Sequence, residues 1–222
     1  MSASGVSLVV TGFGVFADVF DNPSMRIVEE LSSNCFACEG FADSIQFKIL
    51  EVSVDGCSSF HDSLQSSDNK EISTTTVFVH IGVNSKGTHI NLEECAYNNM
   101  TFRVPDVKGF QPESATIFSE CPLDQPLYSS LCLAQICQAL NQTVPVLPGR
   151  EDVNLVQLSQ DPGRYLCNYV YYQALSHHKA QQKPMLSVFV HVPPFEVMPQ
   201  NVQVDLVKQL LILIAKNAAE QI

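Results

Sequence analysis

The chain has 222 residues, of which 45% are apolar and 16% are charged, so it suits one compact domain over residues 1–222 and not a disordered chain. Its formal net charge of −11 repels phosphate backbones and anionic lipid, so we expect neither nucleic acid nor a membrane as a partner. No apolar stretch is long enough to span a bilayer.

The N-terminus and the cysteines indicate a cytoplasmic protein. The first residues lack the basic segment and the long apolar core of a signal peptide. The eight cysteines have no framework spacing, so we expect mostly free thiols that pack as small core residues. Cys35 and Cys38 have CxxC spacing without a second pair at zinc-site distance, which favours a turn or packing role over a metal or redox role.

Strands and helices alternate in the first part of the chain. Residues 6–10 form an apolar run that predicts a buried strand. Asn22 before Pro23 predicts a helix with an asparagine N-cap, and its apolar stripe fades at residues 32–34. Three further elements are predicted here, which are strands over residues 47–54 and 76–81 and a short helix over residues 57–64.

The second part begins with poor periodicity over residues 85–120, which we expect to be irregular with one strand or ribbon. A helix over residues 128–140, a Pro/Gly loop over 144–152 and a strand over 153–158 follow. The last predicted elements are a helix with the apolar face Leu166, Val170, Tyr171 and Ala174, a strand over residues 185–192 and a closing helix over residues 202–214.

The predicted strands are near-continuous apolar runs separated by helices. This pattern is typical of a mostly parallel sheet that is covered by helices on both faces. The sequence therefore predicts an α/β fold, in the form of a single three-layer α/β/α domain. Ligands of such sheets bind outside the carboxyl ends of the strands.

Cys167 and His191 are the leading candidates for chemistry. Gly163 precedes the helix that carries Cys167, so the thiol should lie near the helix N-terminus, where backbone N–H groups and the helix dipole favour a thiolate and could hold an oxyanion. His191 ends an apolar strand and could take and return the thiol proton. His80 lies inside a strand and is predicted to be a core histidine.

Four segments resemble one family, pyroglutamyl peptidase I, the cysteine peptidases that remove an N-terminal pyroglutamate from peptides. The resemblance implies an α/β/α fold, no cofactor, no metal and a triad that falls on Glu93, Cys167 and His191. Glu93 is preferred to Glu94 because of its spacing to the later motifs. The matching segments are residues 10–16 with Asn22-Pro23-Ser24, residues 92–98, Arg103-Val104-Pro105-Asp106, and residues 165–170 with His191-Val192-Pro193.

The same resemblance implies residues that bind the pyroglutamyl ring. Phe13 and Phe16 would clamp the ring, although plain core packing is the alternative for such aromatic side chains. Asn22 matches the family pattern and could also act only as an N-cap. Arg103 matches an arginine near the family's active site, with a salt bridge to Asp106 or another acid as the alternative.

The entry loop departs from the family pattern. Val15 stands where the family usually has proline, and Ala17-Asp18 replaces a pair of glycines. This departure motivates the alternative of a non-catalytic relative that binds acylated N-termini. An amidase for a different small acyl group is a further alternative. The oligomeric state stays open.

Overall fold

The protein was analysed as a computed structural model, which describes residues 5–16, 21–65, 74–143, 154–180 and 185–221. The predicted loop over residues 144–152 and the pair Ala17-Asp18 lie outside these ranges. Among the described residues, no helix has both the length and the apolar character needed to cross a membrane.

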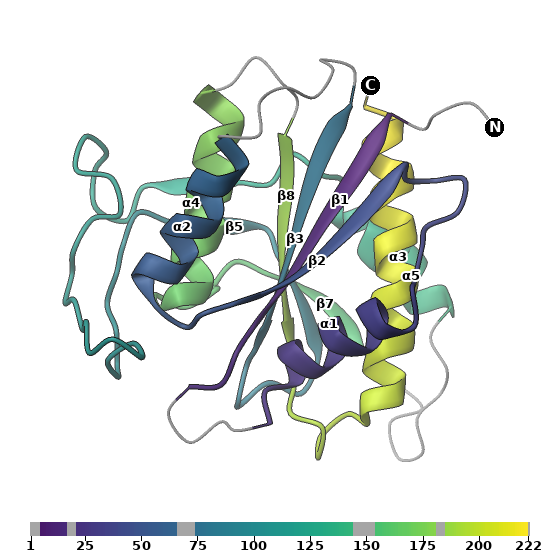
Figure 1. Cartoon of the computed structure of the whole chain (residues 1–222), viewed down its shortest axis with the longest axis horizontal. Coiled ribbons are helices and arrows are strands. Elements are labelled where there is room, and N and C mark those ends of the chain that lie inside the picture. The colour runs from purple at the N-terminus through teal and green to yellow at the C-terminus, as the bar shows by residue number, and fades with distance from the viewer. Residues whose placement is uncertain (1–4, 17–20, 66–73, 144–153, 181–184, 222) are drawn as a thin grey trace.

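A mostly parallel sheet forms the centre of the fold (Figure 1). Within the described residues it has six strands in the order β2-β1-β3-β8-β4-β7. The strands β2, β1, β3 and β8 are parallel to one another, whereas β4 is antiparallel to β8 and parallel to β7. The bounds are β1 Val6–Phe13, β2 Ser44–Leu50, β3 Thr75–Val83, β4 Ile90–Glu93, β7 Val156–Ser159 and β8 Met185–Val192.

Helices cover both faces of this sheet, which confirms the predicted three-layer α/β/α fold (Figure 1). The helices α1 (Pro23–Ser33), α3 (Leu133–Thr143) and α5 (Gln200–Ala219) pack on one face. The helices α2 (Val54–Gln65) and α4 (Leu166–Ala180) pack on the other. Strand residues alternate between two cores, since Leu8 and Val10 face the first group and Val9 faces the second.

Several predicted boundaries differ from the structure by a few residues, and two of them were wrong for identifiable reasons. The strand predicted to end at Val54 ends at Leu50, because Ser53 caps α2: its Oγ accepts from Gly56 N at 2.9 Å and its carbonyl from Cys57 N at 3.1 Å. The helix predicted from Tyr128 begins at Leu133. Tyr128 instead ends β6 (Pro126–Tyr128), which pairs with β5 (Cys95–Tyr97) in a small separate ladder.

The start of α1 was predicted correctly. The Asn22 side chain accepts from Ser24 N at 3.1 Å, and Pro23 occupies the first helical turn. The Asn22 amide also donates to Gly14 O at 3.0 Å. The N-cap therefore ties the start of α1 to the chain just beyond β1.

The side chains that face α2 and α4 include a row of buried groups across the sheet. His80 of β3 lies between Thr11 of β1 and Phe189 of β8 in the strand register, and it is fully buried, as predicted for a core histidine. Burial lowers the pKa of its imidazole, and its Nδ1 lies 2.8 Å from Thr11 Oγ1. Two residues further along these strands, Gly82 lies opposite His191.

Candidate active site

Cys167 is the second residue of α4, so the thiol lies in the first turn of a helix, as predicted. Tyr165 O accepts from Tyr169 N at 3.1 Å and so begins the helical hydrogen bonding. Gly163 has a φ of +74°, a backbone conformation that glycine adopts without strain. The chain thus turns into the helix and presents Cys167 beside N–H groups that have no partner within the helix.

His191 and Glu93 form a buried pair. The His191 Nδ1–H donates to Glu93 Oε1 at 2.8 Å, and the Glu93 side chain is fully buried. Because β4 runs antiparallel to β8, Glu93 lies opposite Phe189, two residues before His191. The carboxylate therefore meets the imidazole from the interior and fixes which ring nitrogen carries this proton.

Gly82 shows where the sulfur lies. Gly82 pairs with His191 in the ladder between β3 and β8. A Cβ added at Gly82 would lie 3.0 Å from Cys167 Sγ. The thiol of α4 therefore occupies the space beside the strand position that pairs with His191, and the three predicted side chains lie together.

The charges of this group favour an ion pair. Burial lowers the pKa of the His191 imidazole, but the Cys167 thiolate and the Glu93 carboxylate together outweigh it and raise the pKa to about 10. The imidazolium thus persists at neutral pH, and it stabilises a thiolate beside it. A thiolate paired with an imidazolium can attack a carbonyl carbon and then protonate a leaving amine.

Two supporting residues were not singled out from the sequence. The Tyr171 hydroxyl donates to Glu93 O at 2.8 Å, one helical turn after Cys167. Gly82 leaves the space that the sulfur fills. The available signal was the glycine that directly follows the predicted apolar strand over residues 76–81. An isolated glycine in such a run often marks a place where another part of the chain comes close to the backbone.

The two candidate aromatic residues occupy different surroundings. Phe13 is buried, and its ring centroid lies 6.3 Å from that of Phe189, whose ring lies 4.7 Å from that of His191. Phe16 is half-buried and lies 6.2 Å from Tyr165, two residues before Cys167. Tyr165 in turn packs against Phe102 at 4.7 Å. Phe16 therefore joins an aromatic group next to the start of α4.

Asn22 has a confirmed structural role. Its Oδ1 accepts from Ser24 N and from Ser24 Oγ, and Ser24 Oγ accepts from Phe13 N at 3.1 Å. The side chain is fully buried and connects the segment of Phe13 and Gly14 to α1. Contact between Asn22 and substrate stays a prediction.

Arg103 is exposed and makes no hydrogen bond or ion pair with any residue that the structure describes. The alternative of a salt bridge to Asp106 is not formed, because the Asp106 oxygens accept from the backbone N–H groups of Val54, Lys108 and Phe110. Thr101 N donates to Arg164 O at 3.0 Å, so this segment lies beside the approach to α4.

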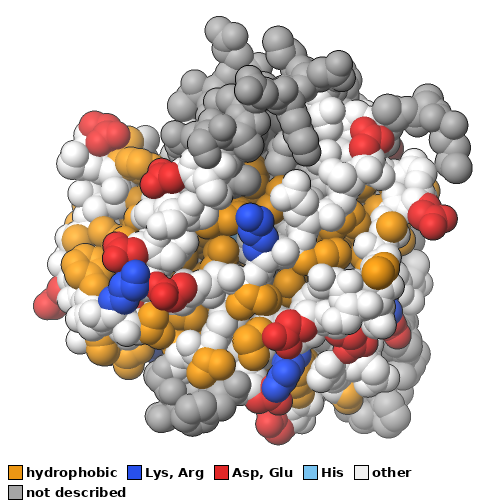
Figure 2. Space-filling model, in the orientation of Figure 1, with side chains coloured by type: hydrophobic (Ala, Val, Ile, Leu, Met, Phe, Trp, Pro, Cys, Tyr) orange, Lys and Arg blue, Asp and Glu red, His pale blue; other side chains and the backbone are white. Residues whose placement is uncertain are grey.

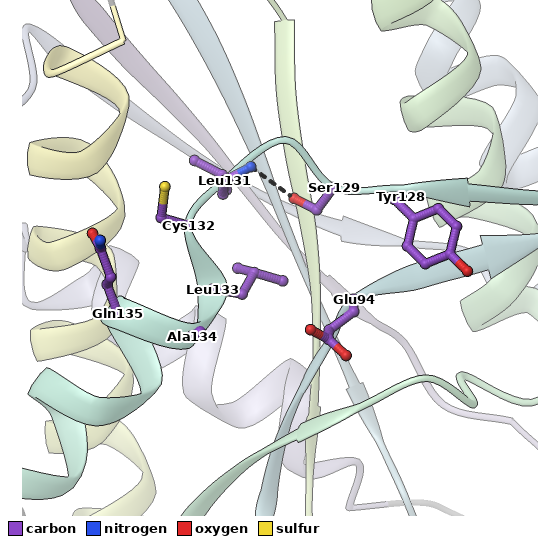
Figure 3. Close-up of a pocket in the computed structure, with 8 residues that line it drawn as sticks. All are labelled: Glu94, Tyr128, Ser129, Leu131, Cys132, Leu133, Ala134 and Gln135. Carbon is purple, nitrogen blue, oxygen red and sulfur yellow. Dashed lines mark hydrogen bonds between the residues drawn. The ribbon is translucent and has the colours of Figure 1, made fainter.

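Glu94 faces a different part of the molecule from Glu93. It lines a surface cavity of about 380 Å³ beside the start of α3, and Figure 3 shows its side chain there together with those of Tyr128 and Cys132. Glu94 Oε2 accepts from Gln160 Nε2 at 2.9 Å. None of the predicted site residues lines this cavity.

The described residues show neither a metal site nor, on the face in view (Figure 2), a basic patch. In the described ranges no group of three or more His, Cys, Asp or Glu residues could hold a metal ion, and Cys35 and Cys38 are free thiols. On the face that Figure 2 shows, basic side chains stand singly among acidic and apolar ones. That face, as far as it is described, carries no basic stripe of the kind that tracks a nucleic-acid backbone.

Comparison with known proteins identifies several similar sequences. The sequence model of the family described as "Pyroglutamyl peptidase" matches residues 6–209. Pyroglutamyl-peptidase 1 of Rattus norvegicus is 30% identical over 190 residues, covering 85% of this chain and 79% of the relative. The pyrrolidone-carboxylate peptidase of Pyrococcus furiosus is 26% identical over 190 residues, covering 85% of this chain and 81% of the relative.

Solved structures share the fold. A mutant pyrrolidone carboxyl peptidase from Pyrococcus furiosus superposes with a TM-score of 0.77 at 23% identity, covering 96% of this chain and 99% of that one. The pyrrolidone carboxyl peptidase of Fervidobacterium islandicum gives a TM-score of 0.75 at 24% identity, covering 93% and 97%. The arrangement of the sheet and helices is therefore common to all three chains.

Proposed function

This chain belongs to the pyroglutamyl peptidase family, and we propose that it removes the N-terminal pyroglutamate from peptides as a cysteine exopeptidase. In this proposal Cys167 is the nucleophile, His191 is the general acid and base, and Glu93 orients the imidazole. The observation that carries it is the buried contact of 2.8 Å between His191 Nδ1 and Glu93 Oε1, with the Cys167 sulfur beside the strand position that pairs with His191.

The reaction follows from this arrangement. The Cys167 thiolate attacks the carbonyl carbon of the pyroglutamyl residue and forms a tetrahedral oxyanion, which backbone N–H groups of the first turn of α4 stabilise. The His191 imidazolium gives its proton to the leaving amine, and the peptide departs from an acyl-thioester. A water molecule then attacks the thioester carbonyl, His191 takes its proton, and pyroglutamate leaves as the thiolate is restored.

Glu93 acts on the imidazole and not on the substrate. Its carboxylate accepts the Nδ1–H bond, which leaves Nε2 as the nitrogen that exchanges a proton with sulfur and amine. The same negative charge stabilises the imidazolium that gives its proton to the amine and that forms again when His191 takes the proton of water. Tyr171 holds the Glu93 carbonyl, which fixes the carboxylate relative to α4.

The pyroglutamyl ring is a small neutral lactam that needs an apolar slot with a few polar contacts. Phe16 lies in the aromatic group beside the start of α4 and is proposed to cover one side of the ring, with Phe13 behind it. Arg103 has no protein partner among the described residues, which leaves its guanidinium available for a carbonyl oxygen of the substrate. Asn22 holds the Phe13 segment and is proposed to act on the ring site from there.

A cytoplasmic location is part of the proposal. All eight cysteines are free thiols, which suits a reducing compartment. A thiolate nucleophile also needs such surroundings, because oxidation of the sulfur would end its reactivity.

A pyroglutamyl amide of a fluorescent amine tests the activity. The purified protein should release the fluorophore, and Cys167→Ala should abolish the release. Cys132→Ala is the matched control, because Cys132 is an exposed free thiol outside the triad. Full activity in Cys167→Ala would overturn the assignment, whereas release from other acyl amides but not from the pyroglutamyl amide would favour the amidase alternative.

A further inference from the structure

We infer that Asn168 is a positioning residue for the nucleophile: it locks the first turn of α4, and with it Cys167, onto the chain segment that follows Glu93. The inference rests on the proposed function, because it assigns Asn168 a role in the reactivity of Cys167. Asn168 itself touches neither substrate nor a reacting atom in this role.

Three hydrogen bonds hold the Asn168 side chain to this segment. Tyr97 N donates to Asn168 Oδ1 at 2.7 Å, and Asn168 Nδ2 donates to Tyr97 O at 2.8 Å and to Asn99 O at 2.9 Å. The side chain is fully buried, so water cannot replace these bonds without a rearrangement. The third residue of α4 is thus held by the backbone at the end of β5.

The bonds of Asn168 connect the helix that carries Cys167 to the segment that carries Glu93. β5 begins at Cys95, two residues after Glu93, so Asn168 fixes the residue next to Cys167 on the same chain segment that carries the carboxylate. Glu93 binds His191, and His191 lies opposite Gly82 in the sheet. The Cys167 sulfur lies next to Gly82, 3.0 Å from where a Cβ at that position would be. Tyr171, one turn along α4, makes a second tie to the Glu93 carbonyl.

A comparable asparagine elsewhere shows what a purely structural role looks like. Asn141 of α3 pairs with β7 by the same two-bond pattern, since Val156 N donates to its Oδ1 at 3.1 Å and its Nδ2 donates to Val156 O at 2.8 Å. α3 carries none of the triad. Loss of either asparagine should reduce stability, but only loss of Asn168 should change the chemistry of a thiol.

The expected consequence is a displaced sulfur. Alanine at position 168 would remove all three bonds, leaving the Tyr97 N–H and the Asn99 carbonyl without this partner, while Tyr97 O would keep its bond from Asn99 N at 2.7 Å. The first turn of α4 would then move away from β5, and the sulfur would separate from the imidazolium that stabilises its charge. Misplacement of a reacting group by about 1 Å can cost about 100-fold in rate.

The test compares Asn168→Ala with Asn141→Ala in the full-length protein. The rate of iodoacetamide labelling of Cys167 is measured between pH 5.5 and about 9 by mass spectrometry of the Cys167 peptide, with the unperturbed thiol value of about 8.5 as reference. We expect Asn168→Ala to label about 10-fold or more slowly at pH 6.5 than the wild type, with its labelling profile moved to higher pH. Asn141→Ala should label like the wild type.

Kinetics of pyroglutamyl-amide cleavage supply the second measurement. Asn168→Ala should lower kcat by up to about 100-fold with little change in KM, and Asn141→Ala should keep the wild-type kcat. If Asn168→Ala does not fold, Asn168→Ser, whose shorter side chain keeps one polar group at this position, is measured in the same way and should show the same direction.

Equal labelling profiles for the wild type and the folded Asn168 variant would overturn the inference, whatever their stabilities. Labelling does not depend on the substrate, so it separates the two proposals. A wild-type protein that cleaves no pyroglutamyl amide would overturn the proposed function, while the labelling comparison would still decide the role of Asn168.

Discussion

Gly82 and His191 lie opposite each other in the parallel ladder between β3 and β8, and the Cys167 sulfur fills the space that a side chain at position 82 would need. A Cβ at Gly82 would lie 3.0 Å from Sγ and 2.7 Å from Phe189 Cζ. The closest of these approaches is shorter than real Cβ contacts show, and the Phe189 ring is fully buried. The position of the Cys167 sulfur therefore depends on the lack of a side chain at Gly82 of β3.

Gly82→Ala should accordingly impair the enzyme. The added methyl must displace the Phe189 ring or the sulfur, and overpacking of this kind costs about 1–3 kcal/mol of stability. Movement of the sulfur away from His191 should lower kcat/KM by about 10-fold or more. Gly14→Ala is the control for stability, because its Cβ would meet only ordinary contacts at 3.5 Å and beyond. Wild-type kcat/KM in a folded Gly82→Ala variant would contradict the expected movement of the sulfur and would show that the Phe189 ring alone gives way.

Replacement of the buried carboxylate tests its role in orienting His191. Glu93→Gln keeps the shape of the side chain but loses the charge that holds the imidazolium and favours one ring tautomer. We expect kcat to fall by about 100-fold to 10,000-fold, as when the acid of other triads is replaced by its amide. Glu94→Gln is the matched control, because Glu94 bonds Gln160 and lines the separate cavity. Equal losses in both variants would argue against a special role for Glu93.

The pH dependence of stability and activity follows from His191. Burial lowers the pKa of its imidazole, but the Cys167 and Glu93 charges raise it to about 10, above the usual unfolded value of about 6.5. Its protonated form therefore stabilises the fold fully below about pH 6.5, and this contribution is lost as the pH rises toward 10. Activity should fall over the upper part of this range, because the leaving amine then lacks its proton donor.

Removal of the thiolate checks the cause of that shift. In Cys167→Ala the charge that contributes most to raising the pKa of His191 is gone, so the pKa should fall below that of the wild type. NMR titration of the His191 ring measures the change directly. A His191 pKa that is the same in Cys167→Ala and in the wild type would show that the sulfur is not its electrostatic partner.

Much of the fold was predictable because its strands are apolar along their whole length. In runs such as residues 185–192 apolar and polar residues do not alternate regularly, which indicates a strand that is buried on both faces. The Asn22-Pro23 pair marks a helix start by local chemistry alone. The end of β2 was missed because Val52 and Val54 continue the apolar pattern, while the deciding feature is the capping bond of Ser53. Tyr128 was misassigned because its pairing partner, Cys95, is distant along the chain.

The candidate site was predictable only in part. Cys167 and His191 could be proposed from helix-start and strand-end positions, whereas Glu93 came from resemblance, since one carboxylate among 23 acidic residues has no distinguishing local pattern. Gly82, Asn168 and Tyr171 act through contacts between elements that are far apart in the sequence. Periodicity and spacing carry no information on such contacts, so the structure was needed to find them.

Substitution of Arg103 should change activity without changing the stability of the fold. Its side chain is exposed and has no partner among the described residues, so Arg103→Ala should change the free energy of unfolding by less than about 0.5 kcal/mol. If the guanidinium binds a carbonyl oxygen of the substrate, kcat/KM should fall by about 10-fold or more, since a hydrogen bond from a charged donor contributes about 1.5–3 kcal/mol. Lys108→Ala is the control, because Lys108 is an exposed cation already paired with Glu51 and Asp55. Unchanged kcat/KM in Arg103→Ala would remove Arg103 from the substrate site and leave the lactam to be held by the aromatic group and the first turn of α4.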